Sequence, residues 1–154
     1  MSIREWLASN DSTTIDMKLL KRRFDFIRSE IRFLQEHVLC KTLEEVKSSP
    51  ILTRVLERSY RLIVEAMIDI ARHIVSVMGW GPCFSASEYI DKLSQHGVLP
   101  RELAGEITKR IKIRDIIVHR YLEIDYDMLY RDTYKLIELA REFKKHIIEF
   151  LKRF

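Results

Sequence analysis

The chain has few of the residues that interrupt helices or cross-link chains. Its 154 residues include only four glycines, three prolines and two cysteines. Scarce Gly and Pro, in a chain dominated by Leu, Ile, Glu, Lys and Arg, favour helix over sheet. Cys40 and Cys83 lie far apart and outside any CxxC motif, which argues against a zinc site or a disulfide framework. We therefore expect an all-α protein with two reduced thiols.

The sequence also lacks long hydrophobic runs. Met1 to Ser9 carries two charges and does not resemble a secretory signal, and no later stretch is apolar enough to span a bilayer. We expect a cytoplasmic protein with no membrane contact. The 27 basic and 23 acidic residues give a net charge of +4, which is only a weak indication of a polyanionic partner such as RNA.

Hydrophobic residues recur at helical spacing in four long segments. The first helix is predicted to begin near Thr13, in a capping box with Asp16, and the second follows Pro50 and ends at Gly79. Pro100 opens a third helix that runs to about Tyr121, and Asp125 caps the last. The last stripe comprises Leu129, Thr133, Leu136, Ala140, Phe143, Ile147, Phe150 and Phe154.

A short helix over residues 87–95, closed by Gly97, is predicted between the second and third long helices. The pattern predicts an up-down four-helix bundle with an extra short helix. We assign residues 13–154 to this single domain and residues 1–12 to an N-terminal extension.

The third helix has an unusual distribution of side chains. On a helical wheel, one arc of roughly 80° holds its apolar stripe together with Arg114 and Tyr121. The stripe comprises Leu103, Ile107, Ile111 and Val118. An arginine there must be paired or must line a cleft. Ile113 and Ile116 are predicted to face the opposite side, where a second copy of the chain would cover them.

The run from Arg114 to Tyr121 resembles the R-x-x-x-x-H-x-Y signature of HepT proteins, which are similar to the wider HEPN superfamily. The Gly-Trp-Gly-Pro connection, the short helix ending in Gly97 and the Tyr-x-x-Ile-Asp segment after the motif resemble that family in order and spacing. The resemblance covers roughly residues 16 to 154. One position departs from the pattern: the family commonly has Asn after the motif arginine, where this chain has Asp115.

The resemblance implies a HEPN-like fold and a metal-independent endoribonuclease toxin, with Arg114 and His119 as catalytic residues in a cleft between two subunits. Asp115, one turn before His119, is expected to orient it, and Arg120 to support the site. The resemblance further implies a nucleotidyltransferase antitoxin as partner, which attaches AMP to Tyr121. A core aromatic role is the alternative for Tyr121.

Arg114 and His119 lie five positions apart, which separates them by roughly 140° on a straight helix. Unless the helix bends, they do not converge within one chain, so we expect a site composed across a homodimer. Two alternatives to a ribonuclease remain: a non-catalytic HEPN module that binds a nucleotidyltransferase, and a bundle that binds RNA without cutting it.

The second helix carries a column of polar residues at i, i+4 spacing, either a support for the cleft or a solvated, salt-linked face. It comprises Arg61, Glu65, Asp69 and His73. None of the five histidines has Glu three residues before it, as a di-iron bundle would need, and no Gly-rich phosphate loop occurs. We expect no metal and no cofactor.

Overall fold

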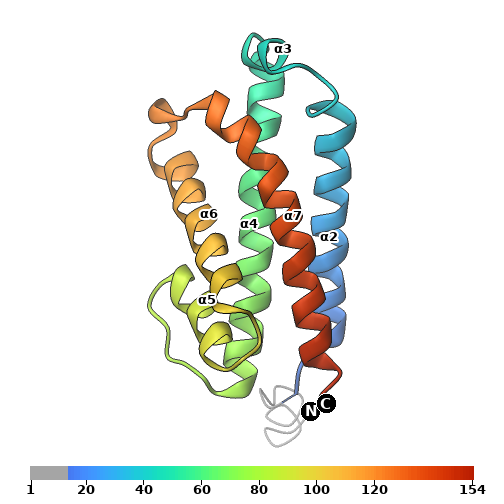
Figure 1. The fold of residues 1–154 in the computed structure, drawn as a ribbon, viewed down its shortest axis with the longest axis vertical. Coiled ribbons are helices and arrows are strands. Elements are labelled where there is room, and N and C mark those ends of the chain that lie inside the picture. Colours follow the sequence, from blue (N-terminus) through green and yellow to red (C-terminus); the bar gives the residue numbers. More distant parts are fainter. Residues whose placement is uncertain (1–13) are drawn as a thin grey trace, which may run out of the picture.

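The computed structural model describes residues 14–154. Over this range the backbone forms six α-helices and a short 3₁₀-helix, with no strand. Four long helices run alternately up and down: α2 (Met17–His37), α4 (Pro50–Met78), α6 (Arg101–His119) and α7 (Tyr126–Leu151) (Figure 1). The predicted all-α, up-down bundle is confirmed.

Side-chain caps fix where three of the long helices begin. The side chains of Asp16, Ser49 and Asp125 each accept a hydrogen bond from a backbone N–H three residues later, which satisfies an otherwise unpaired donor of the first turn. The α2 helix therefore begins at Met17, later than predicted. The predicted capping role of Thr13 and the extension over residues 1–12 lie outside the described residues.

Two short helices complete the bundle. The α5 helix (Ala86–Gln95) is the predicted one, and α3 (Leu43–Lys47) was missed because five residues are too few to show a hydrophobic period. Its signal was the capping box of Thr42 and Glu45: the Thr42 hydroxyl accepts from the Glu45 N–H at 3.2 Å and donates to its carboxylate at 3.2 Å.

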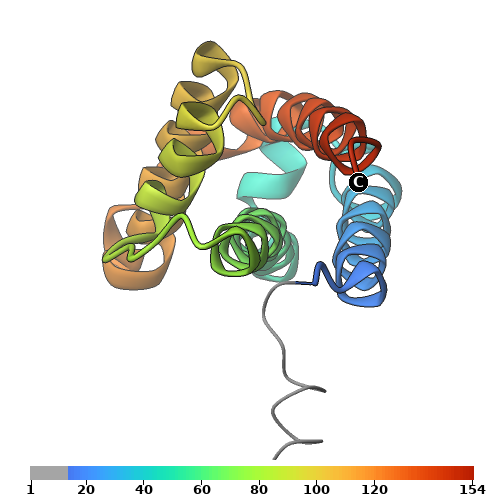
Figure 2. The same cartoon turned by 90° about the horizontal axis from the view of Figure 1, so that it is seen from below.

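The α4 helix contributes most to the core, since it contacts α2, α3, α5, α6 and α7. Figure 2 shows the four long helices of the bundle seen from one end. The predicted stripe of α7 is buried from Leu129 to Phe150. Phe154 is an exception, 72% exposed, because α7 ends at Leu151. None of the helices in residues 14–154 has the length and apolar character needed to cross a bilayer.

Candidate active site at the end of α6

The motif occupies the last two turns of α6 and the corner that follows. Leu103, Ile107 and Ile111 are buried, as predicted, and hold the first part of the helix against the core. The helix ends at His119, because Arg120 adopts non-helical backbone angles. Tyr121 opens the short helix η1 (Tyr121–Glu123), which leads into α7 at one end of the bundle (Figure 1). The predicted end of this helix near Tyr121 is thus two residues too late.

The Arg114 side chain is partly buried, with 18% of its surface exposed. Its Nε atom is buried and has no hydrogen-bond partner among residues 14–154. Oδ1 of Asp115 lies 3.3 Å from this nitrogen, as an ion pair without hydrogen-bond geometry. A guanidinium carries five N–H donors, so Arg114 retains the capacity to bind an anion. Of the two expectations for an arginine on this stripe, a partner or a cleft, the structure shows the partner, Asp115.

Asp115 has a different neighbour from the one predicted. Its carboxylate lies against Arg114, and no ion pair to His119 occurs among the described residues. Arg114, the neighbour of Asp115 in the sequence, thus takes the place of His119, the predicted partner one turn away. Asp115 therefore partly neutralises Arg114, and its predicted contact with His119 is wrong in this structure.

His119, Arg120 and Tyr121 all have exposed side chains. Tyr121 is 67% exposed, so the alternative of a core aromatic is wrong for the single chain. The side chain of Arg120 reaches Glu123, with 3.8 Å between Nη1 and Oε2. The imidazole of His119 and the hydroxyl of Tyr121 are thus both accessible at the corner after α6.

The apolar side chains beside the motif are only partly arranged as predicted. Ile113 packs against the core, together with Ile117, so its placement on the outer face is wrong. Val118, predicted in the buried arc, is 36% exposed, and Leu122 is 88% exposed. Val118 and Leu122 therefore contribute exposed apolar surface at the corner after α6.

Another arginine of α6, Arg110, lies one turn before the motif and has hydrogen-bond partners on all sides. Reasoning from the sequence did not identify it. Arg110 is 8% exposed, and its Nε and Nη2 atoms donate to the carboxylate of Asp132 on α7, at 3.1 and 2.6 Å. Tyr60 on α4 donates to the same carboxylate at 2.6 Å, and Arg110 Nη1 donates to Glu106 at 2.6 Å. This network joins α4, α6 and α7 one helical turn before the motif.

The ionisation of the network follows from these contacts. Burial lowers the pKa of Arg110, but the hydrogen bond and charge of Asp132 act in the opposite direction, and the net shift is upward. Burial, with the hydrogen bond to Asp132, raises the pKa of Tyr60 far above its usual value. The network therefore keeps its arginine charged and its tyrosine protonated.

The polar column on α4 connects mainly to α2. Asp69 pairs with Arg72 at 2.9 Å and with Arg23 of α2 at 3.4 Å. His73 accepts a hydrogen bond at Nε2 from the Asp16 N–H, at 2.9 Å. Arg61 lies 3.9 Å from Glu65. These contacts give the column a role in joining two helices.

The part of the chain that the structure describes contains no group of three or more His, Cys, Asp or Glu side chains arranged to hold a metal ion. Cys40 is exposed and Cys83 half-buried, and both are free thiols.

Both the sequence and the fold match known proteins. A family model described as Ribonuclease HepT-like matches residues 27–149. The chain belongs to this family. The resemblance to HepT proteins inferred from the motif is thereby confirmed, and the matched HepT-like region includes every motif residue from Arg114 to Tyr121.

A curated relative is the tRNA nuclease HepT of Aphanizomenon flos-aquae (strain 2012/KM1/D3). It is 28% identical over 118 residues, which cover 77% of this chain and 80% of the relative.

Solved structures share the fold of this HepT-like chain. The tri-AMPylated Shewanella oneidensis HEPN toxin, solved in complex with MNT antitoxin, matches with a TM-score of 0.78 at 22% identity and covers 85% of this chain and 97% of its own. The cytosolic protein YutE from Bacillus subtilis, of unknown function, matches with a TM-score of 0.78 at 20% identity. It covers 90% of this chain and 92% of its own. At these identities the likeness shows the HEPN fold.

Proposed function

We propose that the chain is a metal-independent endoribonuclease that cuts RNA in a cleft shared by two copies. The observation that carries this proposal is the pairing of residue types in one motif. Arg114 is partly buried with a guanidinium that lacks full hydrogen bonding, and His119 is exposed at the adjacent helix end. Membership of the HepT-like family supports the reaction class, as does the relative named a tRNA nuclease.

The chemistry needs a proton acceptor, a proton donor and a fixed cation. The ribose 2′-oxygen attacks the adjacent phosphorus and gives up its proton to one imidazole; the bond from phosphorus to the 5′-oxygen breaks, and a second imidazole protonates that oxygen. Arg114 stabilises the charge on the phosphorane. Each chain has a single His in the motif, so two copies related by a two-fold axis supply both proton-transfer groups.

The test is cleavage of single-stranded RNA in excess chelator. His119→Ala and Arg114→Ala are each expected to reduce the cleavage rate by a factor of about 10² to 10⁴. Matched controls are His37→Ala and Arg101→Ala, since both side chains are exposed and outside the motif; these variants should cleave at the wild-type rate. Equal losses in the controls would contradict the assignment of the motif as the active site.

The shared cleft has its own test. Wild-type chains refolded together with an equal amount of His119→Ala form mixed dimers in which one imidazole is missing. Only about a quarter of the dimers then contain two wild-type chains, so activity should fall to about a quarter of that of the same total amount of wild-type protein. A fall to one half would mean that each chain works alone. A monomer mass in light scattering would also exclude the shared cleft.

We further propose that a nucleotidyltransferase antitoxin inactivates the protein by adding AMP to Tyr121. The exposed hydroxyl is accessible to a second protein, and the structural relative in complex with MNT antitoxin is AMPylated. The Tyr121 oxygen would bond to the α-phosphorus of ATP as pyrophosphate leaves and the phenolic proton is lost. The added phosphate would compete with RNA for the cations. After co-expression, intact mass should show adenylate on wild type and on Tyr134→Phe, but not on Tyr121→Phe.

One observation favours a non-catalytic module as the second candidate. The Asp115 carboxylate, 3.3 Å from Arg114, reduces the attraction of that arginine for phosphate. If the wild-type protein binds the transferase yet leaves RNA intact in the assay above, this second function replaces the first.

A further inference from the structure

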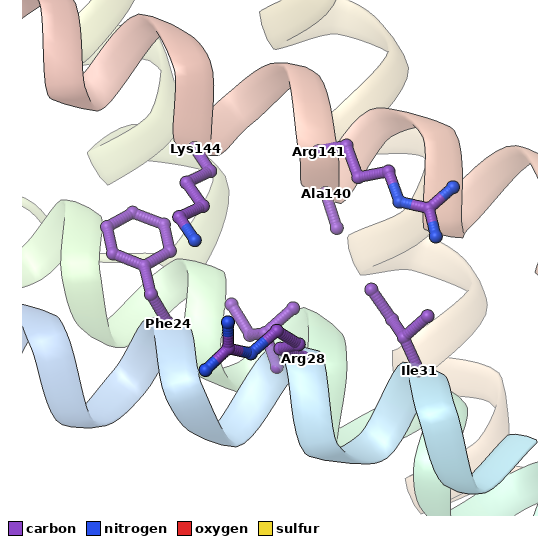
Figure 3. Close-up of a pocket in the computed structure, with 7 residues that line it drawn as sticks. Phe24, Arg28, Ile31, Ala140, Arg141 and Lys144 are labelled. Carbon is purple, nitrogen blue, oxygen red and sulfur yellow. The ribbon is translucent and has the colours of Figure 1, made fainter.

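A pocket of about 230 Å³ opens between α2 and α7, on helices that carry none of the motif residues. Figure 3 shows its residues on the two facing helices, with Phe24, Arg28 and Ile31 on α2 and Ala140, Arg141 and Lys144 on α7. Ile27 completes the lining. Phe24, Ile27, Ile31 and Ala140 are buried core residues, so the pocket has an apolar floor.

The charged residues of the pocket all have the same sign. Arg28, Arg141 and Lys144 contribute three cations, and none of the lining residues is acidic. Among residues 14–154, Arg141 and Lys144 form no ion pair, and Arg28 has only Asp25, at 3.5 Å. The ammonium of Lys144 lies 5.8 Å from the centre of the Phe24 ring. The cations therefore lie at the pocket with little internal neutralisation.

We propose that this pocket binds one unpaired nucleotide of an RNA strand, with its phosphate on the three cations and its base against the apolar floor. A ligand for the pocket must combine concentrated negative charge with an apolar body, and a nucleotide has both. The volume of about 230 Å³ is below that of pockets that enclose a drug-sized ligand, so the pocket takes no more than one base, with the sugar and phosphate at its rim. A second copy of the chain is a poor occupant, because a symmetric contact would bring six cations together.

This inference rests on the proposed ribonuclease function and adds a second contact for the same substrate. Arg141 and Lys144 lie 15 and 18 residues after Tyr126, the first residue of α7, which corresponds to roughly 25 Å along the helix. A trinucleotide with bases stacked about 3.4 Å apart spans only about 10 Å and reaches one site at a time. A longer RNA reaches both. The pocket therefore selects long RNA over short fragments.

The experiment measures RNA binding in a His119→Ala background, where cleavage does not interfere. Arg141→Ala combined with Lys144→Ala is expected to weaken binding of an RNA of about 30 nucleotides roughly tenfold and to lower the slope of log K against log salt by about 1.4. In the same background, an RNA of equal length without bases should bind more weakly than ordinary RNA but keep its salt slope, because it loses the contact with the apolar floor and retains the phosphates that meet the cations. The matched control, Lys145→Ala with Arg153→Ala, removes the same charge outside the pocket and should leave binding nearly unchanged.

Three results would overturn the proposal. These are equal weakening by the pocket and control variants, unchanged binding in the pocket variant, and equal affinity for RNA with and without bases. In an otherwise wild-type chain, the pocket variant should raise KM for long RNA about tenfold while leaving trinucleotide cleavage unchanged. A wild-type protein that binds RNA through the pocket but never cuts it would remove the proposed function and keep this binding site.

Discussion

The carboxylate of Asp132 binds the guanidinium of Arg110 through two hydrogen bonds, Nε to Oδ2 at 3.1 Å and Nη2 to Oδ1 at 2.6 Å. Both side chains are largely buried, with 10% and 14% of their surfaces exposed. A bidentate pair of this kind fixes orientation as well as distance. Because Arg110 is one helical turn before Arg114, the pair fixes α6 against α7 just before the motif begins.

We predict that Asp132→Asn lowers the free energy of unfolding by about 2 kcal/mol, since it weakens two charge-assisted hydrogen bonds and leaves the buried Arg110 with Glu106 as its remaining carboxylate partner. Adding Arg110→Met should recover part of the loss, because the weakly compensated charge is then gone. Urea denaturation measures both. The control is Glu138→Gln, which removes an exposed ion pair with Lys135 of 3.9 Å. It should change the free energy of unfolding by less than about 1 kcal/mol. A loss at Asp132 no larger than in the control would contradict this account.

Arg110 also shows where sequence reasoning about the site reaches its limit. Arg110 and Arg114 are one turn apart on the same face of α6, and the sequence alone does not reveal which one is paired. The decisive partner, Asp132, lies 22 residues away on another helix. The motif residues could be identified because their spacing is local. Their neighbours depend on how α6, α7 and α4 pack.

We predict that Asp115→Asn increases RNA cleavage or RNA affinity by roughly threefold to tenfold, because removal of the carboxylate 3.3 Å from Nε frees the Arg114 guanidinium for phosphate. Initial rates over a range of RNA concentrations would separate KM from kcat, and a fall in KM is expected. Glu123→Gln, which removes the carboxylate near the exposed Arg120, serves as the control. A large loss of kcat in Asp115→Asn would instead assign the carboxylate to the reaction itself.

The long helices could be predicted because each shows its stripe over many turns and begins at a capping residue or a proline. The exact ends could not, because they depend on backbone angles at one or two residues. The stripe of α6 predicted burial of Val118, yet the bundle no longer covers the helix at that point. Tertiary packing, which a helical wheel does not contain, decides how far along a helix the buried face extends.

We predict opposite effects of the same substitution at two glycines. Gly79 ends α4 with φ of +68°, a left-handed conformation that disfavours a Cβ, so Gly79→Ala should destabilise the protein by about 1 kcal/mol. Gly105 lies exposed within α6, and an added Cβ meets no atom within 4 Å, so Gly105→Ala should stabilise by about 0.5 to 1 kcal/mol. Thermal unfolding of the two variants compares them directly; stabilisation by Gly79→Ala would show that its backbone angle is not the reason for glycine there.

A last prediction concerns alkaline pH. Burial, together with the hydrogen bond to Glu57, raises the pKa of Tyr126 from 10.0 to about 12. Folding therefore favours the protonated phenol, and its contribution to stability is complete below pH 10 and is lost as pH rises from about 10 to about 12. In that window Tyr126→Phe should reduce the pH slope of the unfolding free energy by up to about 1.4 kcal/mol per pH unit. Urea titrations at successive pH values measure this slope. The control Tyr121→Phe removes an exposed phenol that takes no part in this contact and should leave the slope nearly as in wild type; an equal change in both variants would mean that the contact with Glu57 does not hold the proton.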